Sequence, residues 1–198
     1  MATRDAGRIL YRRPLGEVLH DQNESVLHKY QNFFIGDSSL RKLLHYEAAM
    51  LLANPWPGAI GFFLRRMFLP GLFRKMGGDV MLGRNLSLRY PGAISIGDRT
   101  AIDDNCLLDA KGCQEDGIEI GADVLIARDT LIQGKNGAVV IGDHSVIGSQ
   151  VRLSSAGGLF IGKYVNIGSQ CHIGGGRFRT NDLEAPIITQ PLYTNGPL

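Results

Sequence analysis

Two histidines, His144 and His172, have the side-chain type and the sequence position best suited to chemistry, because imidazole takes up and releases a proton near neutral pH. The other three, His20, His28 and His45, lie among predicted helices, where packing or a surface position explains them. A zinc ion held by histidines alone needs three of them. The repeats described below contain only two, so no metal is expected.

The cysteines, the N-terminal segment and the net charge exclude further classes of protein. Cys106, Cys113 and Cys171 form no C-x-x-C pair and leave one cysteine over, which argues against a disulfide framework or a zinc knuckle. The N-terminal segment has no continuous apolar run like that of a secretion signal. A net charge of +2 gives no reason to expect nucleic acid as a partner. We therefore expect a cytoplasmic protein.

The elements that position the two histidines follow from a six-residue period. An aliphatic residue followed by glycine, alanine or aspartate occurs in four tandem pairs, and a third aliphatic residue follows each pair. Strands have a period of 2 and helices a period of 3.6, so this pattern predicts a solenoid with three short strands per coil. The pairs are I-G-D-R-T-A-I-D-D-N-C-L from Ile96, I-G-A-D-V-L-I-A-R-D-T-L from Ile120, I-G-D-H-S-V-I-G-S-Q-V-R from Ile141 and I-G-K-Y-V-N-I-G-S-Q-C-H from Ile161.

Alternation along each strand predicts which side chains face the core. Positions 1 and 5 of each hexapeptide point inward, so Cys106 and Cys171 are expected to be small core residues. Position 6 points outward and forms columns whose apolar members a partner subunit would cover. The predicted outward columns are Leu107, Leu131, Arg152 and His172 on the third strands, and Ala101, Leu125, Val146 and Asn166 on the second.

Residues 1–78 lack the six-residue repeat and are predicted to form a helical appendage. Helical spacing of apolar residues runs over 24–34, 38–52 and 59–69. The segment F-F-L-R-R-M-F-L-P-G-L-F-R-K mixes bulky apolar and basic residues, as helices that lie on membranes do. The favoured interpretation is a helix packed on the main domain. The alternative is a peripheral contact of residues 58–75 with the inner face of the membrane.

The tandem repeat pattern resembles that of the hexapeptide-repeat acyltransferases. The helical N-terminus and the tail G-G-G-R-F-R-T-N-D-L-E-A-P-I-I-T-Q-P-L-Y-T-N-G-P-L are most similar to the sugar O-acetyltransferase branch, which modifies bacterial surface polysaccharides. The resemblance covers residues 79–198. It implies a mainly β protein, a left-handed parallel β-helix with an α-helical N-terminal appendage, assembled as a homotrimer with active sites between subunits.

The resemblance also implies a reaction. An acyl group would move from a coenzyme A thioester, acetyl-CoA or another acyl-CoA, to a sugar hydroxyl of a surface polysaccharide or glycolipid. Such enzymes use a histidine as general base and backbone N–H groups to stabilise the oxyanion. His172 is the candidate base, because it faces outward beside the long corner loop 174–197, whereas His144 occupies a turn. The predicted donor-phosphate contacts are Lys135, Lys163, Arg177 and Arg179, and the predicted acceptor contacts are Asn181 and Asp182.

Two departures from the family pattern keep an alternative open. Phe178 stands where the family has a histidine in the corner loop, and the chain stops at N-G-P-L, where members of the family begin further coils. The second departure is expected of a truncated chain or of a degenerate member. The alternative is a non-catalytic β-helix that serves as an assembly or binding module. A γ-class carbonic anhydrase is disfavoured for want of a third histidine, and a nucleotidyltransferase for want of a nucleotide-binding domain.

Overall fold

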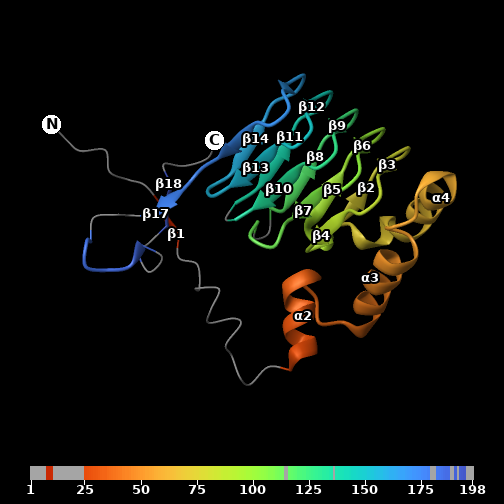
Figure 1. Cartoon of the computed structure of the whole chain (residues 1–198), viewed down its shortest axis with the longest axis horizontal. Coiled ribbons are helices and arrows are strands. Elements are labelled where there is room, and N and C mark those ends of the chain that lie inside the picture. Colours follow the sequence, from red (N-terminus) through yellow and green to blue (C-terminus); the bar gives the residue numbers. More distant parts are fainter. Residues whose placement is uncertain are drawn as a thin grey trace.

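Three short helices precede the solenoid in the computed structural model, which describes residues 8–10, 25–113, 116–135, 137–178, 182–187, 190 and 192–194 (Figure 1). They are α2 (Val26–Phe34), α3 (Leu40–Leu52) and α4 (Gly58–Phe68), and a single 3-10 turn, Pro70–Leu72, follows. Their ends lie within two residues of the predicted helices. Ser25 caps α2 by accepting a hydrogen bond from the N–H of His28. None of the helices in these ranges is long and apolar enough to cross a membrane.

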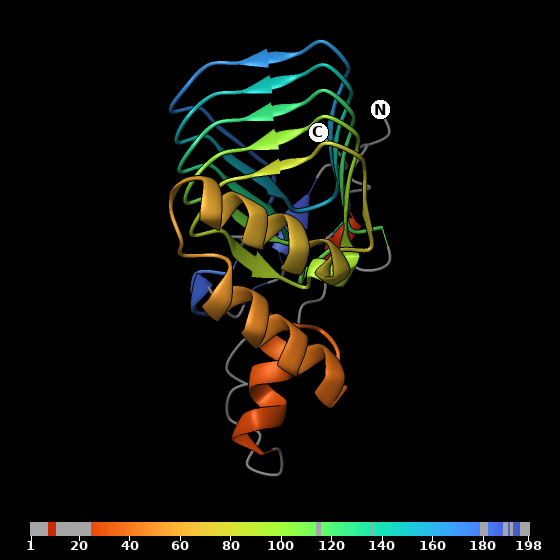
Figure 2. The same ribbon diagram turned by 90° about the vertical axis from the view of Figure 1, so that its right-hand side faces the viewer.

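The remainder forms a parallel β-solenoid of five coils, as the repeats predicted (Figures 1 and 2). Each coil contributes one strand to each of three five-stranded parallel sheets. The first sheet contains β2 (Lys75–Met76), β5 (Ile94–Ile96), β8 (Ile118–Ile120), β11 (Val139–Ile141) and β14 (Leu159–Ile161). The second contains β3 (Met81–Leu82), β6 (Ala101–Ile102), β9 (Leu125–Ile126), β12 (Val146–Ile147) and β15 (Asn166–Ile167). The third contains β4 (Ser87–Arg89), β7 (Leu107–Asp109), β10 (Leu131–Gly134), β13 (Arg152–Ser155) and β16 (His172–Gly174).

The register of the sheets confirms both predicted outward columns. Leu107 pairs with Leu131, Leu131 with Arg152 and Arg152 with His172 along the third sheet. The second sheet aligns its four predicted residues in the same way, with Met81 added below them. Equivalent residues of successive coils pair in register because each coil repeats the same strand positions. The residues by which a coil exceeds three hexapeptides lie in the corner after its third strand.

The core fills as the six-residue pattern predicts. Position-1 aliphatics such as Ile126 and Ile147 are fully buried. Position 5 holds small residues because the inside of each corner has little room. Three of these residues carry a hydroxyl group, and each hydroxyl has a hydrogen-bond acceptor. Thr100, Thr130 and Ser145 each donate to a glycine carbonyl of the next coil, at 2.7 to 2.9 Å. These inward hydrogen bonds join successive coils where no strand pairing occurs.

Two columns of corner residues adopt left-handed backbone conformations, a feature that the sequence analysis did not predict. Their φ angles lie between +53° and +62°. Asn and Asp tolerate this region better than other non-glycine residues, because their short side chains can bond to nearby backbone. The columns are Asp79, Arg99, Asp123, His144 and Tyr164 after the first sheet, and Asn85, Asn105, Asp129, Gln150 and Gln170 after the second.

The helices cap the first coil with side-chain hydrogen bonds. Tyr46 on α3 donates to the carbonyl of Leu88, and Arg65 on α4 donates through Nε to that of Leu82, both at 2.8 Å. Asn54, between the helices, donates to the carbonyl of Leu86 and accepts from its N–H. Unpaired strand edges invite association with other chains. The appendage therefore covers the first edge of the solenoid, and Figure 2 shows α4 and α3 lying against that end.

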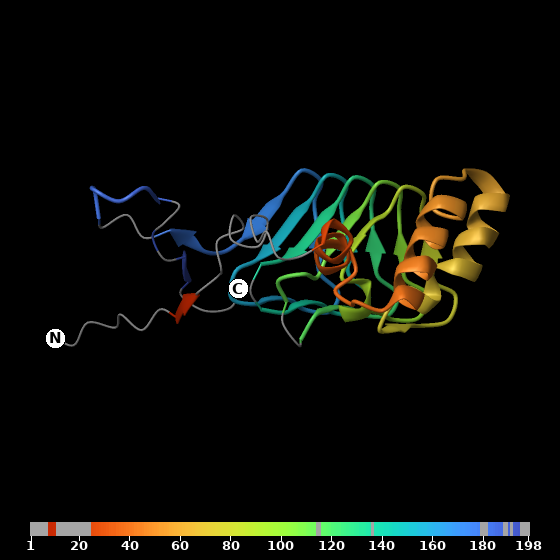
Figure 3. The same ribbon diagram turned by 90° about the horizontal axis from the view of Figure 1, so that it is seen from below.

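Beyond the last coil, the chain forms a small antiparallel sheet that joins its two terminal regions. β17 (Arg177–Phe178) pairs with β18 (Leu192–Thr194), and β18 pairs with β1 (Arg8–Leu10). Figures 1 and 3 show this sheet beside the end of the solenoid opposite the helices. The repeat pattern predicted a corner loop over 174–197, and no strand was expected at residues 8–10. Both edges of β18 are therefore paired within the chain.

Candidate functional site

His172 lies on the outer side of the last strand of the third sheet and is exposed. The residue two positions on, Gly174, explains the direction of its ring. A Cβ atom at Gly174 would lie 3.1 Å from His172 Nε2 and 3.4 Å from Ser154 Cβ. The histidine ring therefore reaches over the glycine, and a larger residue at 174 would crowd it.

A second outward column runs beside the predicted one on the third sheet, and it is polar. The register aligns Arg89 with Asp109, Asp109 with Gln133, Gln133 with Ser154 and Ser154 with Gly174. Two members of this column, Asp109 and Ser154, are buried, and α2 packs against β4 at its first member. The Arg89 guanidinium lies 4.8 Å from the ring centre of Phe33 on α2. Polar side chains thus line the third sheet from α2 to the fourth coil, and Gly174 takes this position in the last coil.

The side chains of Asp109 and Gln133 form a hydrogen bond with each other within this column. Asp109 is 3% exposed, and its carboxylate accepts hydrogen bonds from Gln133 Nε2 at 3.1 Å and from the N–H of Lys111 at 3.0 Å. Ser154 is 2% exposed, and its Oγ has no hydrogen-bond partner within the described part of the chain. A buried hydroxyl without a partner costs about 1–3 kcal/mol. Because Ser154 Oγ is buried, a ligand can bond to it only if the residues that cover it move aside.

His144 lies where the sequence analysis placed it, in a corner turn with φ of +60°. Its ring stacks on that of Tyr164 with centroids 4.7 Å apart, and Nδ1 lies 3.6 Å from an Asp123 oxygen. Arg99 donates to both oxygens of Asp123, and this contact holds the pKa of that carboxyl below its ordinary value. The histidine is one member of a charged corner column, and on the described residues it has a structural role.

Of the predicted donor contacts, only Lys135 and Lys163 have described side chains, and these two lie in different coils. Lys163 lies in the corner between β14 and β15 and pairs with Asp143 at 2.7 Å, a contact that raises the pKa of the lysine. Lys135 directly follows β10, two coils from His172, which corresponds to about 10 Å along the stack. Arg177 belongs to β17, and its side chain lies outside the described residues, as does the whole of Arg179.

Of the two predicted acceptor contacts, one lies outside the described residues and the other lies within them. Asn181 lies outside the described residues. Asp182 is exposed, and its Oδ1 accepts hydrogen bonds from the N–H groups of Glu184 and Ala185. Its carbonyl accepts from the side chain of Gln190. Asp182 therefore stabilises a turn of the loop, and a contact with an acceptor remains a prediction.

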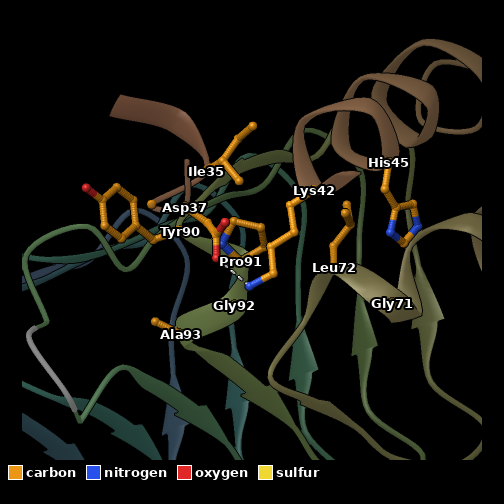
Figure 4. A pocket seen from close by; sticks show the side chains of 11 residues that line it. Ile35, Asp37, Lys42, His45, Gly71, Leu72, Tyr90, Pro91, Gly92 and Ala93 are labelled. Atoms are coloured by element: carbon orange, nitrogen blue, oxygen red, sulfur yellow. Dashed lines mark hydrogen bonds and ion pairs between the residues drawn. The ribbon is translucent and has the colours of Figure 1, made fainter. Parts of the chain in front are cut away.

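A cavity of about 220 Å³ lies between the helices and the first coil, away from His172 (Figure 4). Lys42 on α3 pairs there with Asp37 at 2.6 Å, and His45 Nε2 donates to the carbonyl of Phe68. None of the residues predicted for the site lines it. The lining residues are Ile35, Gly36, Asp37, Lys42, His45, Gly71, Leu72, Tyr90, Pro91, Gly92 and Ala93.

The cysteines are placed as core residues rather than reactive groups. Cys106 and Cys113 are fully buried, and burial raises the pKa of Cys106 to about 11 and that of Cys113 to about 12. Cys171 in the last coil is half-buried. Within the ranges that the structure covers, no three His, Cys, Asp or Glu side chains gather as ligands for a metal ion.

Sequence reasoning missed the polar column, although a signal for it was present. In each coil the residue after the third-strand aliphatic is polar or glycine: Arg89, Asp109, Gln133, Ser154 and Gly174. Alternation places these residues outward, where polar side chains are ordinary. Their burial depends on how the corner loops and α2 fold over the sheet, and the repeat pattern does not encode it.

Neither a family model nor a curated protein matches the sequence. Among solved structures, the chain is similar to hexapeptide-repeat acetyltransferases. One is a galactoside acetyltransferase in complex with coenzyme A, with 20% identity over 69% of this chain and 75% of that chain, and a TM-score of 0.43. Another is a hexapeptide-repeat-containing acetyltransferase from Vibrio cholerae, with 18% identity over 70% and 89% of the two chains and a TM-score of 0.42. At these levels the comparisons assign no substrate and no catalytic residue.

Proposed function

We propose that this protein is a cytoplasmic O-acetyltransferase that moves an acetyl group from acetyl-CoA to a sugar hydroxyl of a surface polysaccharide or glycolipid. The observation that carries the proposal is the exposed imidazole of His172, which lies over Gly174 on the outer side of the last coil. The hexapeptide pattern and its resemblance to the acyltransferases supply the reaction class. Another acyl-CoA could serve as donor by the same chemistry.

In the proposed reaction, His172 Nε2 is the general base. It accepts the proton of the attacking hydroxyl, the sugar oxygen bonds to the thioester carbonyl carbon, and the carbon–sulfur bond then breaks. The proton passes from His172 to the thiolate of coenzyme A, so charge and atoms balance. Ser154 Oγ is buried and has no partner in the described part of the chain. We propose that it binds a second hydroxyl of the sugar once the residues that cover it move aside, and so orients the first. Lys135 directly follows β10 of the same sheet, and we propose it as a phosphate contact.

We further propose a homotrimer whose subunits meet at the outward apolar columns. Met81, Leu125 and Val146 on the second sheet are 54%, 45% and 38% exposed, and they lie in register. A row of exposed apolar side chains on a flat sheet favours contact with another subunit. His172 lies at the end of the neighbouring column, so a subunit boundary there would place it in a cleft.

The test measures transfer directly. The full chain is incubated with acetyl-CoA and a panel of mono- and oligosaccharides, while thiol release and the mass of acetylated sugar are followed. We expect His172→Ala to lower kcat/KM by about 10²–10⁴-fold, the usual contribution of a general base. Ser154→Ala is expected to raise the KM for the sugar more than it lowers kcat. His144→Ala is the matched control and leaves turnover unchanged.

The second candidate function is a non-catalytic sugar-binding module. It is favoured by Phe178 at the position of the family histidine and by the dispersed lysines. Sugar binding without thiol release in the wild-type chain would support this module and exclude the enzyme. Full turnover by His172→Ala would exclude His172 as the base.

A further inference from the structure

Two exposed apolar ridges mark the helical appendage. On α4, Ile60, Phe63 and Met67 follow the spacing i, i+3, i+7 and so share one side of the helix. On α3, three leucines form a similar ridge. All six side chains are between 62% and 72% exposed, well above what a packed helix shows. The leucines are Leu40, Leu44 and Leu51.

Both ridges face away from the solenoid. On α4 the buried residues Gly61 and Arg65 lie on the opposite side of the helix, and Arg65 is anchored to the carbonyls of Leu82 and Trp56 at 2.8 and 2.7 Å. On α3 the buried residues include Tyr46, which donates to the first coil. These bonds fix the orientation of both helices. If either helix were rotated so that its ridge faced the protein, the hydrogen bonds between that helix and the first coil would break.

The charge of this region differs from that of the rest of the chain. Residues 25–75 contain seven Lys and Arg and two Asp and Glu, whereas the whole chain has a net charge of only +2. The remainder is therefore net negative. Arg41 follows Leu40 on α3, and Arg66 precedes Met67 on α4, so exposed cations flank both ridges. Arg66 lies 3.5 Å from Asp79 in an exposed ion pair, a contact that contributes little.

We infer that the helical appendage binds the surface of an anionic lipid bilayer through these two ridges. Helices that lie in the interface insert apolar side chains beneath the headgroups and place Lys and Arg among the phosphates. The ridges supply the apolar part and the excess of cations supplies the electrostatic attraction. The inference does not depend on the proposed catalytic function, because it uses none of the residues near His172.

A second copy of this chain fits the same surface less well. Two copies meeting through these helices would bring two cationic regions together, and like charges in contact oppose association. The solenoid has its own apolar columns for contact between subunits, on the second and third sheets. Charge complementarity therefore selects an anionic surface as the occupant.

Vesicle flotation of the full chain tests the inference. Vesicles of phosphatidylcholine with phosphatidylglycerol are compared with vesicles of phosphatidylcholine alone, at low and high salt. We expect binding to the anionic vesicles that weakens as salt is added. Phe63→Ser and Leu44→Ser are each expected to reduce partitioning about tenfold or more, because an apolar side chain no longer enters the lipid. Arg41→Glu and Arg66→Glu are each expected to reduce it at least about fivefold.

Matched variants on the solenoid are the controls. Phe160 is 56% exposed on the first sheet and Arg128 is exposed at a corner, so Phe160→Ser and Arg128→Glu make the same chemical changes away from the helices. Both should bind vesicles like the wild type. Circular dichroism checks that each variant is folded, since all of the changed side chains are exposed.

Three results would overturn the inference. The first is that the wild type stays with the buffer in the presence of anionic vesicles. The second is that Phe63→Ser and Phe160→Ser lose the same amount of binding. The third is that Phe63→Ser converts an oligomer to a smaller species in light scattering while vesicle binding is unchanged. That outcome would assign the ridges to contact between copies of the chain.

Discussion

The two ends of the solenoid are built from the same repeat but differ in how well they are closed. At the first coil, Leu86 and Leu88 are 1% exposed beneath α3 and α4, and side chains from the appendage bond to their backbone. At the last coil, the corresponding inward residues Cys171 and Ile173 are only half-buried. A hexapeptide therefore specifies which way a side chain points, whereas its burial depends on what covers the coil.

Truncating a core residue at each end gives the largest expected difference. Leu88 and Ile173 occupy the same inward position of the third sheet, four coils apart. Leu88→Ala is expected to lower the free energy of unfolding by about 3 kcal/mol, because it leaves a cavity in a closed core. Ile173→Ala removes a partly exposed side chain, and we expect about 1 kcal/mol. Urea unfolding followed by circular dichroism measures both, and equal losses would contradict the difference between the ends.

Removing a single capping side chain should have an intermediate effect. Asn54→Ala leaves the N–H and the carbonyl of Leu86 without their partners at 2.8 Å. Unsatisfied backbone groups of this kind cost about 2 kcal/mol in total. Asn166→Ala, an exposed outward residue on the last coil, is the control, with an expected change of less than about 0.5 kcal/mol. A negligible effect of Asn54→Ala in the same unfolding experiment would show that the first edge does not need this clamp.

The smallest expected effect is a difference in labelling rate between two native cysteines, and its measurement needs no substitution. Cys106 and Cys171 share one hexapeptide position, but Cys106 is fully buried with a pKa raised to about 11, and Cys171 is half-buried. At pH 8 we expect iodoacetamide to modify Cys171 first, while Cys106 reacts only after unfolding, because thiolate and access are both required. Peptide mass spectrometry after timed labelling reads out the order. Equal rates would mean that the second coil opens as readily as the fifth.

Much of the fold could be predicted because the six-residue period is itself a structural rule. The aliphatic residues at Ile120 and Ile141, twenty-one positions apart, predicted a strand pair that the structure confirms in register. The helical ranges were also predictable from apolar spacing. The pairing of β1 with β18 was not, because Arg8–Leu10 finds its partner more than 180 residues away and no repeat links them.

The candidate site was predictable only in part. The outward direction of His172 followed from alternation, and the register confirms it. The His172 ring lies over Gly174, and Ser154 is buried, and the repeat pattern encodes neither feature. Lys163 was predicted to contact a phosphate, but its pairing with Asp143 follows from the stacking of two corners twenty residues apart.

The left-handed corner residues make the solenoid open to engineering. Ten of them stand in two columns at the surface, and several are residue types that prefer other backbone conformations, such as Gln150 and Gln170. A left-handed conformation costs such a residue about 1 kcal/mol, and asparagine or glycine less. Replacing corner residues one coil at a time would therefore raise the melting temperature in small steps without redesigning the core.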